Sequence, residues 1–215
     1  MQASGDEYSI VNPGSANIGT DEISVGLIYR ADKVSLVGSA VVLDSSNSPL
    51  DEDENPLFID NKNRPSLIQS FSVNDSVFTV SVNHLKSKGS ACDEPDEGSL
   101  GQGNCNITRT KAAQALVQFL ATDPTGSGAD DFLILGDLNA YSKEDPMQVF
   151  YDAGFTNLKY TEASTEEQPY SYSFSGFLGS LDHALATSGL SEKVVSVDAW
   201  HINSVEDSLM DYETE

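Results

Sequence analysis

Two polar side chains follow a short apolar segment near the middle of the chain. Residues 132–135 are apolar, and Gly136, Asp137, Leu138 and Asn139 come directly after them. A run of this length that ends at a glycine is typical of a buried strand. Because residues two apart in an extended chain point the same way, Asp137 and Asn139 are expected to share one face. Such a pair could hold a divalent cation, an attacking water or a phosphate oxygen. A polar turn is the alternative interpretation, since Gly, Asp and Asn are common turn residues.

A second polar cluster ends the predicted strand at residues 76–85. Alternation places His84 on the apolar face of this strand, and Lys86 and Lys88 follow it. A histidine titrates near neutral pH and can carry a proton to or from a water or a leaving oxygen. The two lysines could receive a phosphate. The alternative is a hydrogen-bonded histidine at the rim of the core.

Two further charged residues lie at predicted strand ends. Arg64 begins the strand before the one that carries His84, and a guanidinium fork suits phosphate oxygens. A surface ion pair is the alternative. Asp182 interrupts an apolar run, with His183 on the opposite face together with Leu181 and Leu185. A buried acid needs a partner, and in active sites that partner is usually a histidine which the acid orients. A structural aspartate that caps a turn is the alternative.

Length and charge restrict the possible functions. The chain has 215 residues, which suits one domain with a real core. Its formal charge is −23, with 34 acids and 11 bases, whereas proteins that bind nucleic acid usually show a basic surface. Activity on nucleic acid would therefore depend on a local site, on bound cations or on screening by salt. Adaptation to salty surroundings would also explain the charge. No apolar run is long enough to cross a membrane, and residues 1–6 do not resemble a signal peptide.

The two cysteines bracket a polar loop. Cys92 and Cys105 flank residues 93–104, which are rich in Gly, Asp and Glu and offer little to pack. A disulfide around a loop of this size would contribute roughly 3 kcal/mol and favours an oxidising compartment. Two free buried thiols are the alternative, and no cysteine pattern indicates zinc.

Hydrophobic periodicity predicts strands in hairpins with two or three helices between them. Helix 108–122, capped by Asn106 or Thr108, and helix 145–153 are expected. The predicted strands are 22–30, 34–43, 66–73, 76–85, 131–136, 170–175, 181–187 and 194–202, with a tight turn at Asn74 and Asp75. Such an order predicts two packed sheets covered by helices.

Four motifs together indicate a family. RPSL at 64–67, NHLK at 83–86, GDLN at 136–139 and SLDH at 180–183 occur in this order. With them the chain resembles the endonuclease/exonuclease/phosphatase superfamily, and most closely its secreted bacterial nucleases. The resemblance implies an α+β fold of the deoxyribonuclease I-like type, a four-layer sandwich of two packed mixed β-sheets flanked by helices. It covers nearly the whole chain, so residues 1–215 are expected to form a single partial domain.

The resemblance also implies roles for individual residues. His84 matches a catalytic histidine near the leaving side of the phosphate, and Arg64 an arginine that supports the phosphate. Asp137 and Asn139 match a pair that orients the attacking water and assists metal binding, while Asp182 matches an acid that orients a second histidine. The implied reaction is hydrolysis of a phosphodiester with Mg²⁺ or Mn²⁺, or with Ca²⁺. Nucleic acid is the expected partner, with no membrane.

The chain departs from this family at both ends. No counterpart of the family's early Asn and metal-binding Glu occurs in residues 1–20, and no Ser-Asp-His in residues 211–215. Neither His183 nor His201 stands in such a motif. We therefore expect a piece of a larger secreted nuclease that is weakly active or inactive without the rest of its parent chain. The alternatives are a phosphatase or lipid phosphodiesterase of the same fold, and an acidic module that binds cations without catalysis.

Overall fold

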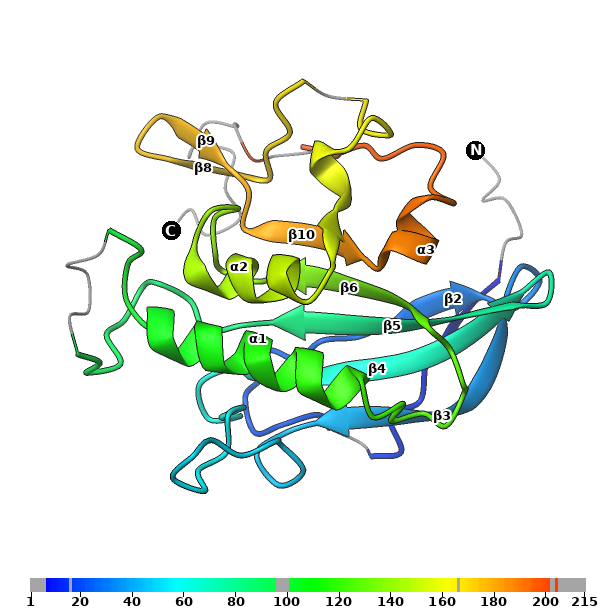
Figure 1. Ribbon diagram of the computed structural model, residues 1–215, viewed down its shortest axis with the longest axis horizontal. Helices are drawn as coiled ribbons and strands as arrows, with labels where there is room; N and C mark the ends of the chain where they lie inside the picture. Colours follow the sequence, from blue (N-terminus) through cyan, green and yellow to red (C-terminus); the bar gives the residue numbers. More distant parts are fainter. Residues whose placement is uncertain (1–6, 16, 96–100, 166, 202–203, 205–215) are drawn as a thin grey trace, which may run out of the picture.

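A six-stranded mixed sheet organises the protein. The computed structural model describes residues 7–15, 17–95, 101–165, 167–201 and 204 (Figure 1). Across the sheet the strands run in the order β3 (Ser35–Leu43), β4 (Arg64–Val73), β5 (Ser76–His84), β6 (Asp131–Asp137), β10 (Asp182–Ala186) and β7 (Thr156–Asn157). Strands β5 and β6 are parallel, and the other neighbours are antiparallel. The last residues of β5 and β6 therefore meet the first residues of β4 and β10 at one edge.

Two helices cover one face of this sheet. Helix α1 (Asn106–Leu120) and helix α2 (Asp145–Asp152) lie side by side over the strands in Figure 1. Leu116 and Phe150 from the helices pack with Ile134 of β6 and Leu185 of β10, all fully buried. A short 3₁₀ helix (Leu158–Tyr160) and α3 (Ser188–Ser191) complete the helical segments of the described residues. None of these helices has the length and apolar character that a membrane span requires.

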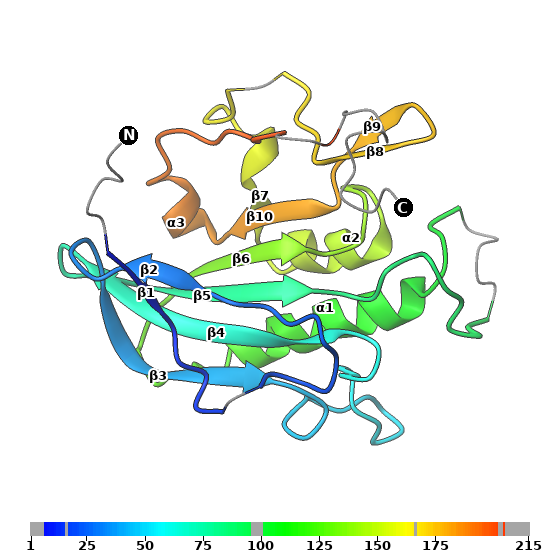
Figure 2. The ribbon, with the colours of Figure 1, turned by 180° about the vertical axis from the view of Figure 1, so that it is seen from behind.

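The opposite face is covered by the N-terminal part of the chain. Strands β1 (Tyr8–Ile10) and β2 (Ile28–Arg30) pair in antiparallel fashion and lie over the large sheet in Figure 2. Val11 and Ile18 from this part pack on Phe71 and Val80 of the large sheet. Helices, a large mixed sheet and a second small sheet thus form successive layers, and the fold is the predicted α+β sandwich.

Most predicted elements are present. The hairpin of β4 and β5 turns at Asn74 and Asp75, whose positive φ angles of 48° and 65° are tolerated by these residue types. The predicted disulfide also forms, with the Cα atoms of Cys92 and Cys105 5.2 Å apart. Helix α1 begins at Asn106, but neither Asn106 nor Thr108 caps it. The Glu94 carboxylate instead accepts hydrogen bonds from the backbone N–H groups of Ile107 and Thr108, at 2.9 and 2.7 Å.

Three predicted strands differ from the structure. Only Ile28–Arg30 of the predicted strand 22–30 pairs as a strand. The predicted strand 194–202 does not form in its described part, where Val197 makes a single parallel bridge with Ser164. Val195 and Trp200 remain 94% and 84% exposed there, because no strand or core among the described residues covers them; residue 202 lies outside the described residues. In place of one strand at 170–175, two short strands form the hairpin β8 (Tyr172–Phe174) and β9 (Phe177–Gly179).

Candidate active site

Four of the predicted site residues lie in one row across adjacent strands. Arg64 of β4 pairs in register with His84 of β5, His84 with Asp137 of β6, and Asp137 with Asp182 of β10. Neighbouring strands are about 4.8 Å apart, so adjacent members of this row are close enough for their side chains to interact. We refer to these residues as the polar row. The structure thus brings them together, and their catalytic roles stay predictions.

His84 and Asp137 are the two members in closest contact. His84 Nε2 lies 3.8 Å from Asp137 Oδ2, and both side chains are about one-third exposed. Burial lowers the pKa of His84, as does the nearby charge of Arg64. Burial likewise raises the pKa of Asp137 to about 6, and the charge of Asp182 adds to the effect although the backbone N–H of Asn139 opposes it. The row therefore holds a carboxylate and an imidazole whose pKa values are shifted toward each other by burial.

Asn139 lies in a turn rather than on the extended strand that the sequence predicts. Strand β6 ends at Asp137, and Asn139 has a φ of 48°. Its backbone N–H donates to Asp137 Oδ1 at 2.8 Å, and its Nδ2 donates to Leu85 O at 3.0 Å. The polar turn is thus present, and it orients the Asp137 carboxylate. Because its side chain donates to the residue after β5 and its backbone donates to the last residue of β6, Asn139 links the ends of these two strands.

The glycine before Asp137 is required by the close approach of β5. Gly136 has a φ of 120°, and a Cβ atom at this position would lie 2.1 Å from the backbone oxygen of Asn83. A residue with a side chain would separate the two strands that carry His84 and Asp137.

The predicted phosphate-binding cations are engaged in other contacts. Arg64 Nη2 lies 2.8 Å from Asp21 Oδ2, as in the alternative interpretation, while its buried Nε has no hydrogen-bond partner among the described residues. Lys86 Nζ donates to Ser90 Oγ at 2.8 Å. Lys88 forms an ion pair with Glu144. Arg64 is therefore the cation within the polar row, and the two lysines lie in the loop that follows β5.

Asp182 differs from its predicted environment. The side chain is exposed rather than buried, and no histidine in the described part of the chain hydrogen-bonds its carboxylate. Its backbone N–H donates to Ser171 Oγ at 3.1 Å. The expectation of a buried acid is wrong because alternation along β10 turns His183, and not Asp182, toward the core.

His183 is a buried residue with a role that the motifs did not reveal. Its Nε2 lies 2.8 Å from Ala140 O, and its Nδ1 lies 2.9 Å from Asn157 Nδ2. A neutral ring with its hydrogen on Nε2 donates to Ala140 and accepts from Asn157. Burial lowers the pKa of His183 to about 4. This histidine fixes the backbone directly after Asn139, and its place on the apolar face was the available signal.

A groove of about 580 Å³ adjoins the polar row. Asn139 and Leu181, which flank the row, belong to its lining. The remaining lining residues come from the loop after β5, the segment between β6 and α2, and the β8–β9 hairpin: Ser87, Lys88, Gly89, Gly101, Gln102, Gly103, Tyr141, Glu144, Tyr172 and Phe174. Sequence reasoning did not find this groove, although Tyr141 follows the GDLN motif and Tyr172 and Phe174 alternate along one strand.

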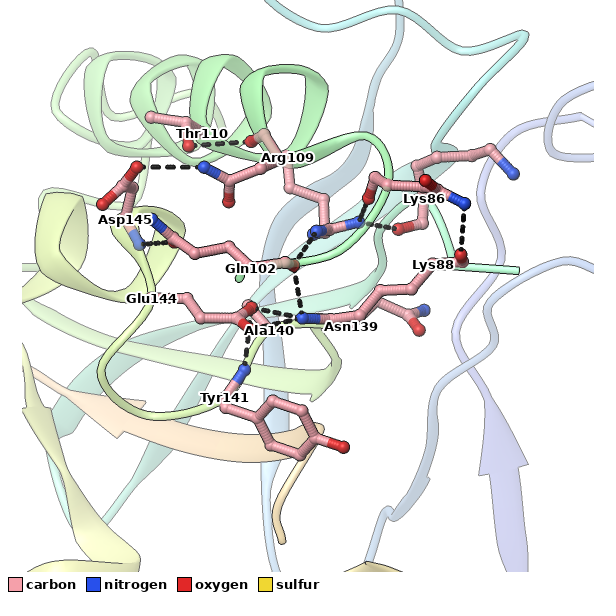
Figure 3. A network of polar contacts seen from close by, with 12 residues as sticks. Lys86, Lys88, Gln102, Arg109, Thr110, Asn139, Ala140, Tyr141, Glu144 and Asp145 are labelled. Carbon is pink, nitrogen blue, oxygen red and sulfur yellow. Dashed lines mark hydrogen bonds and ion pairs between the residues drawn. The ribbon is translucent and has the colours of Figure 1, made fainter. Parts of the chain in front are cut away.

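Buried charges fasten the loop that forms one wall of the groove. The ammonium of Lys88 contacts the Glu144 carboxylate and donates to Gln102 O at 2.8 Å (Figure 3). The fully buried Arg109 of α1 donates to Lys86 O at 3.0 Å and to Asn104 O at 2.7 Å (Figure 3). With the disulfide, these contacts hold the loop against both helices.

The donors of the polar row suit part of a divalent cation site. The described residues contain no group of three or more His, Cys, Asp or Glu that could hold a metal ion. Mg²⁺, however, is usually bound by one or two carboxylates together with waters and substrate phosphate oxygens. Asp137 and Asp182 supply two carboxylates at paired positions, and a cation between them would relieve their mutual repulsion. The side chain of Asn139, which donates to Leu85 O, is the weaker candidate ligand.

Comparisons with known proteins bear on the family and the fold of the chain. A model of the Endonuclease/Exonuclease/phosphatase family matches residues 30–204, whereas no curated protein matches the chain. The human Nocturnin catalytic domain is a similar solved structure, with 15% identity over 75% of this chain and 51% of that one and a TM-score of 0.50. A mannosyl-6-phosphatase from Bacteroides thetaiotaomicron has 16% identity over 76% of this chain and 56% of that one, with a TM-score of 0.51. A humanized D. rerio TDP2 has 14% identity over 85% of this chain and 61% of that one, with a TM-score of 0.51. The chain thus spans about half to three-fifths of the length of these structures.

Proposed function

Because the chain belongs to the endonuclease/exonuclease/phosphatase family, whose members hydrolyse phosphoester bonds and generally use divalent metal ions, we propose that its polar row hydrolyses phosphodiesters of nucleic acid. The observation that carries this proposal is the strand register, which aligns Arg64, His84, Asp137 and Asp182 at one edge of the sheet. A guanidinium, an imidazole and two carboxylates at adjacent positions can bind a phosphate and transfer protons around it.

Each residue of the row has a chemical task in this reaction. Arg64 and His84 donate hydrogen bonds to the phosphate oxygens. Asp137 accepts a proton from the attacking water as the new oxygen–phosphorus bond forms. The opposite phosphorus–oxygen bond then breaks, and the leaving oxygen takes up a proton, with His84 placed to donate to it. Asp137 and Asp182 would hold a divalent cation, Mg²⁺ or Mn²⁺ or else Ca²⁺, which when bound offsets the negative charge of the phosphate.

A phosphomonoester is the second candidate substrate. One of the similar structures is a mannosyl-6-phosphatase, and at 16% identity this likeness extends to the fold. The net charge of −23 also makes a small substrate easier to approach than a polyanion. Mannose 6-phosphate belongs among the assayed substrates for this reason.

We also propose that the protein works in an oxidising compartment, at the cell surface or outside the cell. The disulfide between Cys92 and Cys105 supports this location, because such bonds persist where thiols are not kept reduced. Alkylation of free thiols in the protein as recovered from its native source would decide the point. Unmodified Cys92 and Cys105 would support this location, and alkylated cysteines would contradict it.

Metal-dependent hydrolysis tests the proposed function. We expect slow cleavage of single-stranded DNA in Mg²⁺ or Mn²⁺, since the described residues offer two carboxylates and no larger ligand group. His84→Ala and Asp137→Asn should each reduce the rate at least about 100-fold. Asp75→Asn is the matched control, because Asp75 lies in the turn at the far end of β5.

The assay has a second readout that does not depend on turnover. Mn²⁺ should broaden the NMR signals of the His84 ring, and Asp137→Asn should abolish this broadening whereas Asp75→Asn should not. Cleavage that needs no divalent ion or that survives His84→Ala contradicts the proposal. So does Mn²⁺ binding that leaves the His84 signals sharp, which would favour an acidic cation-binding module.

A further inference from the structure

We propose that the groove beside the polar row stacks an unpaired nucleobase, so that the substrate of this site is single-stranded nucleic acid. The inference rests on the proposed function and adds a substrate class to it. The groove is bounded on one side by Asn139 and Leu181, which lie two residues after Asp137 and one residue before Asp182. A nucleotide whose phosphate occupies the row therefore has the groove within reach of its base.

Aromatic rings give the groove its character. Tyr141, Tyr172 and Phe174 line it, and the last two are 40% and 62% exposed. The rings of Tyr172 and Phe174 lie nearly parallel, at 12° with centroids 6.2 Å apart. They present flat apolar surface to the solvent beside the polar row. Such surface suits the face of a base, because stacking on an aromatic side chain contributes binding energy for any base.

The third ring is held in place by the hairpin. A Cβ atom at Gly179 of β9 would lie 2.5 Å from Tyr141 Cε1, so the absence of a side chain there admits the ring. Lys88 Nζ lies 4.8 Å from the centroid of the same ring. Tyr141 thus joins the loop wall to the hairpin wall, and the groove is a formed site rather than a gap between loops.

The charges of the groove favour an uncharged part of a ligand. Among the described lining residues Lys88 is the cationic one, and Glu144 neutralises it. A phosphate would gain little there, and the net charge of −23 opposes a polyanion in general. Stacking needs no cation, so it can hold a nucleic acid on an acidic protein. Binding should accordingly not weaken as the salt concentration rises, because few counterions are released and salt screens the repulsion.

A duplex cannot use this site without disruption. The faces of paired bases are covered by their neighbours in the stack, and a base must leave the helix before an aromatic side chain can contact it. An unpaired base has its face free. The groove therefore discriminates by strandedness rather than by sequence, since each base has a π-face.

A short oligonucleotide with an uncharged backbone tests this inference separately from hydrolysis. The probe is a methylphosphonate-linked trinucleotide that contains 2-aminopurine, whose fluorescence is quenched when it stacks. Its neutral backbone removes charge repulsion and resists cleavage. We expect quenching by the protein, and an increase of about tenfold or more in Kd for the double variant Tyr172→Leu/Phe174→Leu.

Phe177→Leu is the matched control. Phe177 lies on the same hairpin, pairs with Phe174 and is 80% exposed, but it does not line the groove. Its replacement should leave Kd unchanged, and a duplex that holds 2-aminopurine in a base pair should show no quenching.

Equal affinity of the double variant and the unchanged protein would overturn the inference, as would an equal loss in Phe177→Leu. The protein could instead bind phosphatidylcholine vesicles without quenching the probe, and the double variant could abolish that binding. This result would overturn the inference and assign the groove to a lipid. Quenching without any DNA cleavage would keep the groove assignment and reject the proposed hydrolysis. Cleavage without quenching would do the reverse.

Discussion

His84 and Asp137 stand at paired positions of two parallel strands, and their side chains approach to 3.8 Å between Nε2 and Oδ2. The strands β5 and β6 are joined through helix α1, so the connection returns the chain to the same edge of the sheet. The contact is therefore fixed by the crossover and not by local sequence. Both partners lie close to the middle of the polar row, where burial shifts their pKa values toward each other.

The ionised Asp137 should cost the protein stability. Its folded pKa of about 6 lies above the ordinary value of 3.8, so ionisation opposes folding from about pH 4 upward, with its full cost above about pH 6. Asparagine avoids this cost and can still accept the N–H of Asn139. We expect Asp137→Asn to raise the free energy of unfolding at pH 7 by about 1 kcal/mol, a value reduced because a third of the side chain is in solvent. Urea unfolding at pH 7 and pH 4 measures this change in free energy. An equal gain in stability at both pH values would show that the ionisation of Asp137 is not its cause.

His183 should make stability fall in acid. Its pKa drops from 6.5 in the unfolded chain to about 4 in the folded protein, so its contribution is complete above pH 6.5 and is lost as pH falls toward 4. The loss amounts to about 3 kcal/mol for this buried ring. The difference in unfolding free energy between the protein and His183→Gln should therefore shrink between pH 7 and pH 4. A difference that stays constant over this range would show that His183 does not titrate on unfolding.

Gly136 should tolerate no side chain. Gly136→Ala combines a positive φ with a Cβ 2.1 Å from Asn83 O, and we expect a loss of about 3 kcal/mol or more together with loss of any hydrolysis. Gly176→Ala is the control, because Gly176 has a φ of 81° with nothing within 4 Å of a Cβ. It should lose only about 1 kcal/mol. Thermal unfolding of both variants gives the comparison, and similar losses would mean that the contact with β5 is unimportant.

Reduction of the disulfide should weaken both the fold and the groove. Cys92 and Cys105 close a loop with a sequence separation of 13, for which the chain-entropy estimate is about 3 kcal/mol. The loop also supplies Gly101, Gln102 and Gly103 to the groove wall. Dithiothreitol should lower the unfolding free energy by this amount and weaken binding of the 2-aminopurine probe. The Cys92→Ala/Cys105→Ala variant should show no response to dithiothreitol, and a response there would assign the effect elsewhere.

The sequence predicted the polar row because strand ends carry local signals. An apolar run followed by Gly136 and Asp137 indicates where β6 stops, and alternation indicates which way His84 points. The sequence alone could place these residues only at the ends of separate strands. The order and register of the strands in the sheet bring them into one row. The Asn74–Asp75 hairpin was predictable for the same reason, since its turn residues and flanking apolar strands are adjacent in the chain.

Features that depend on distant partners were not predictable. Residues 194–201 have the pattern of a strand, but no described neighbour pairs with them beyond the bridge at Val197. Helix α1 takes its cap from Glu94, across the loop, and not from its own first residues. The buried Arg109 binds carbonyl oxygens of that loop, which no periodicity reports. In each case a contact between distant segments decides the structure.

Crystals soaked in Mn²⁺ and inorganic phosphate test the central claim most directly, with anomalous scattering to locate the metal. The account predicts Mn²⁺ about 2.1 Å from a carboxylate oxygen of Asp137. It also predicts a phosphate within hydrogen-bonding distance of His84 or Arg64. Mn²⁺ that binds only along the acidic loop at residues 51–54, with no phosphate at the polar row, would contradict it.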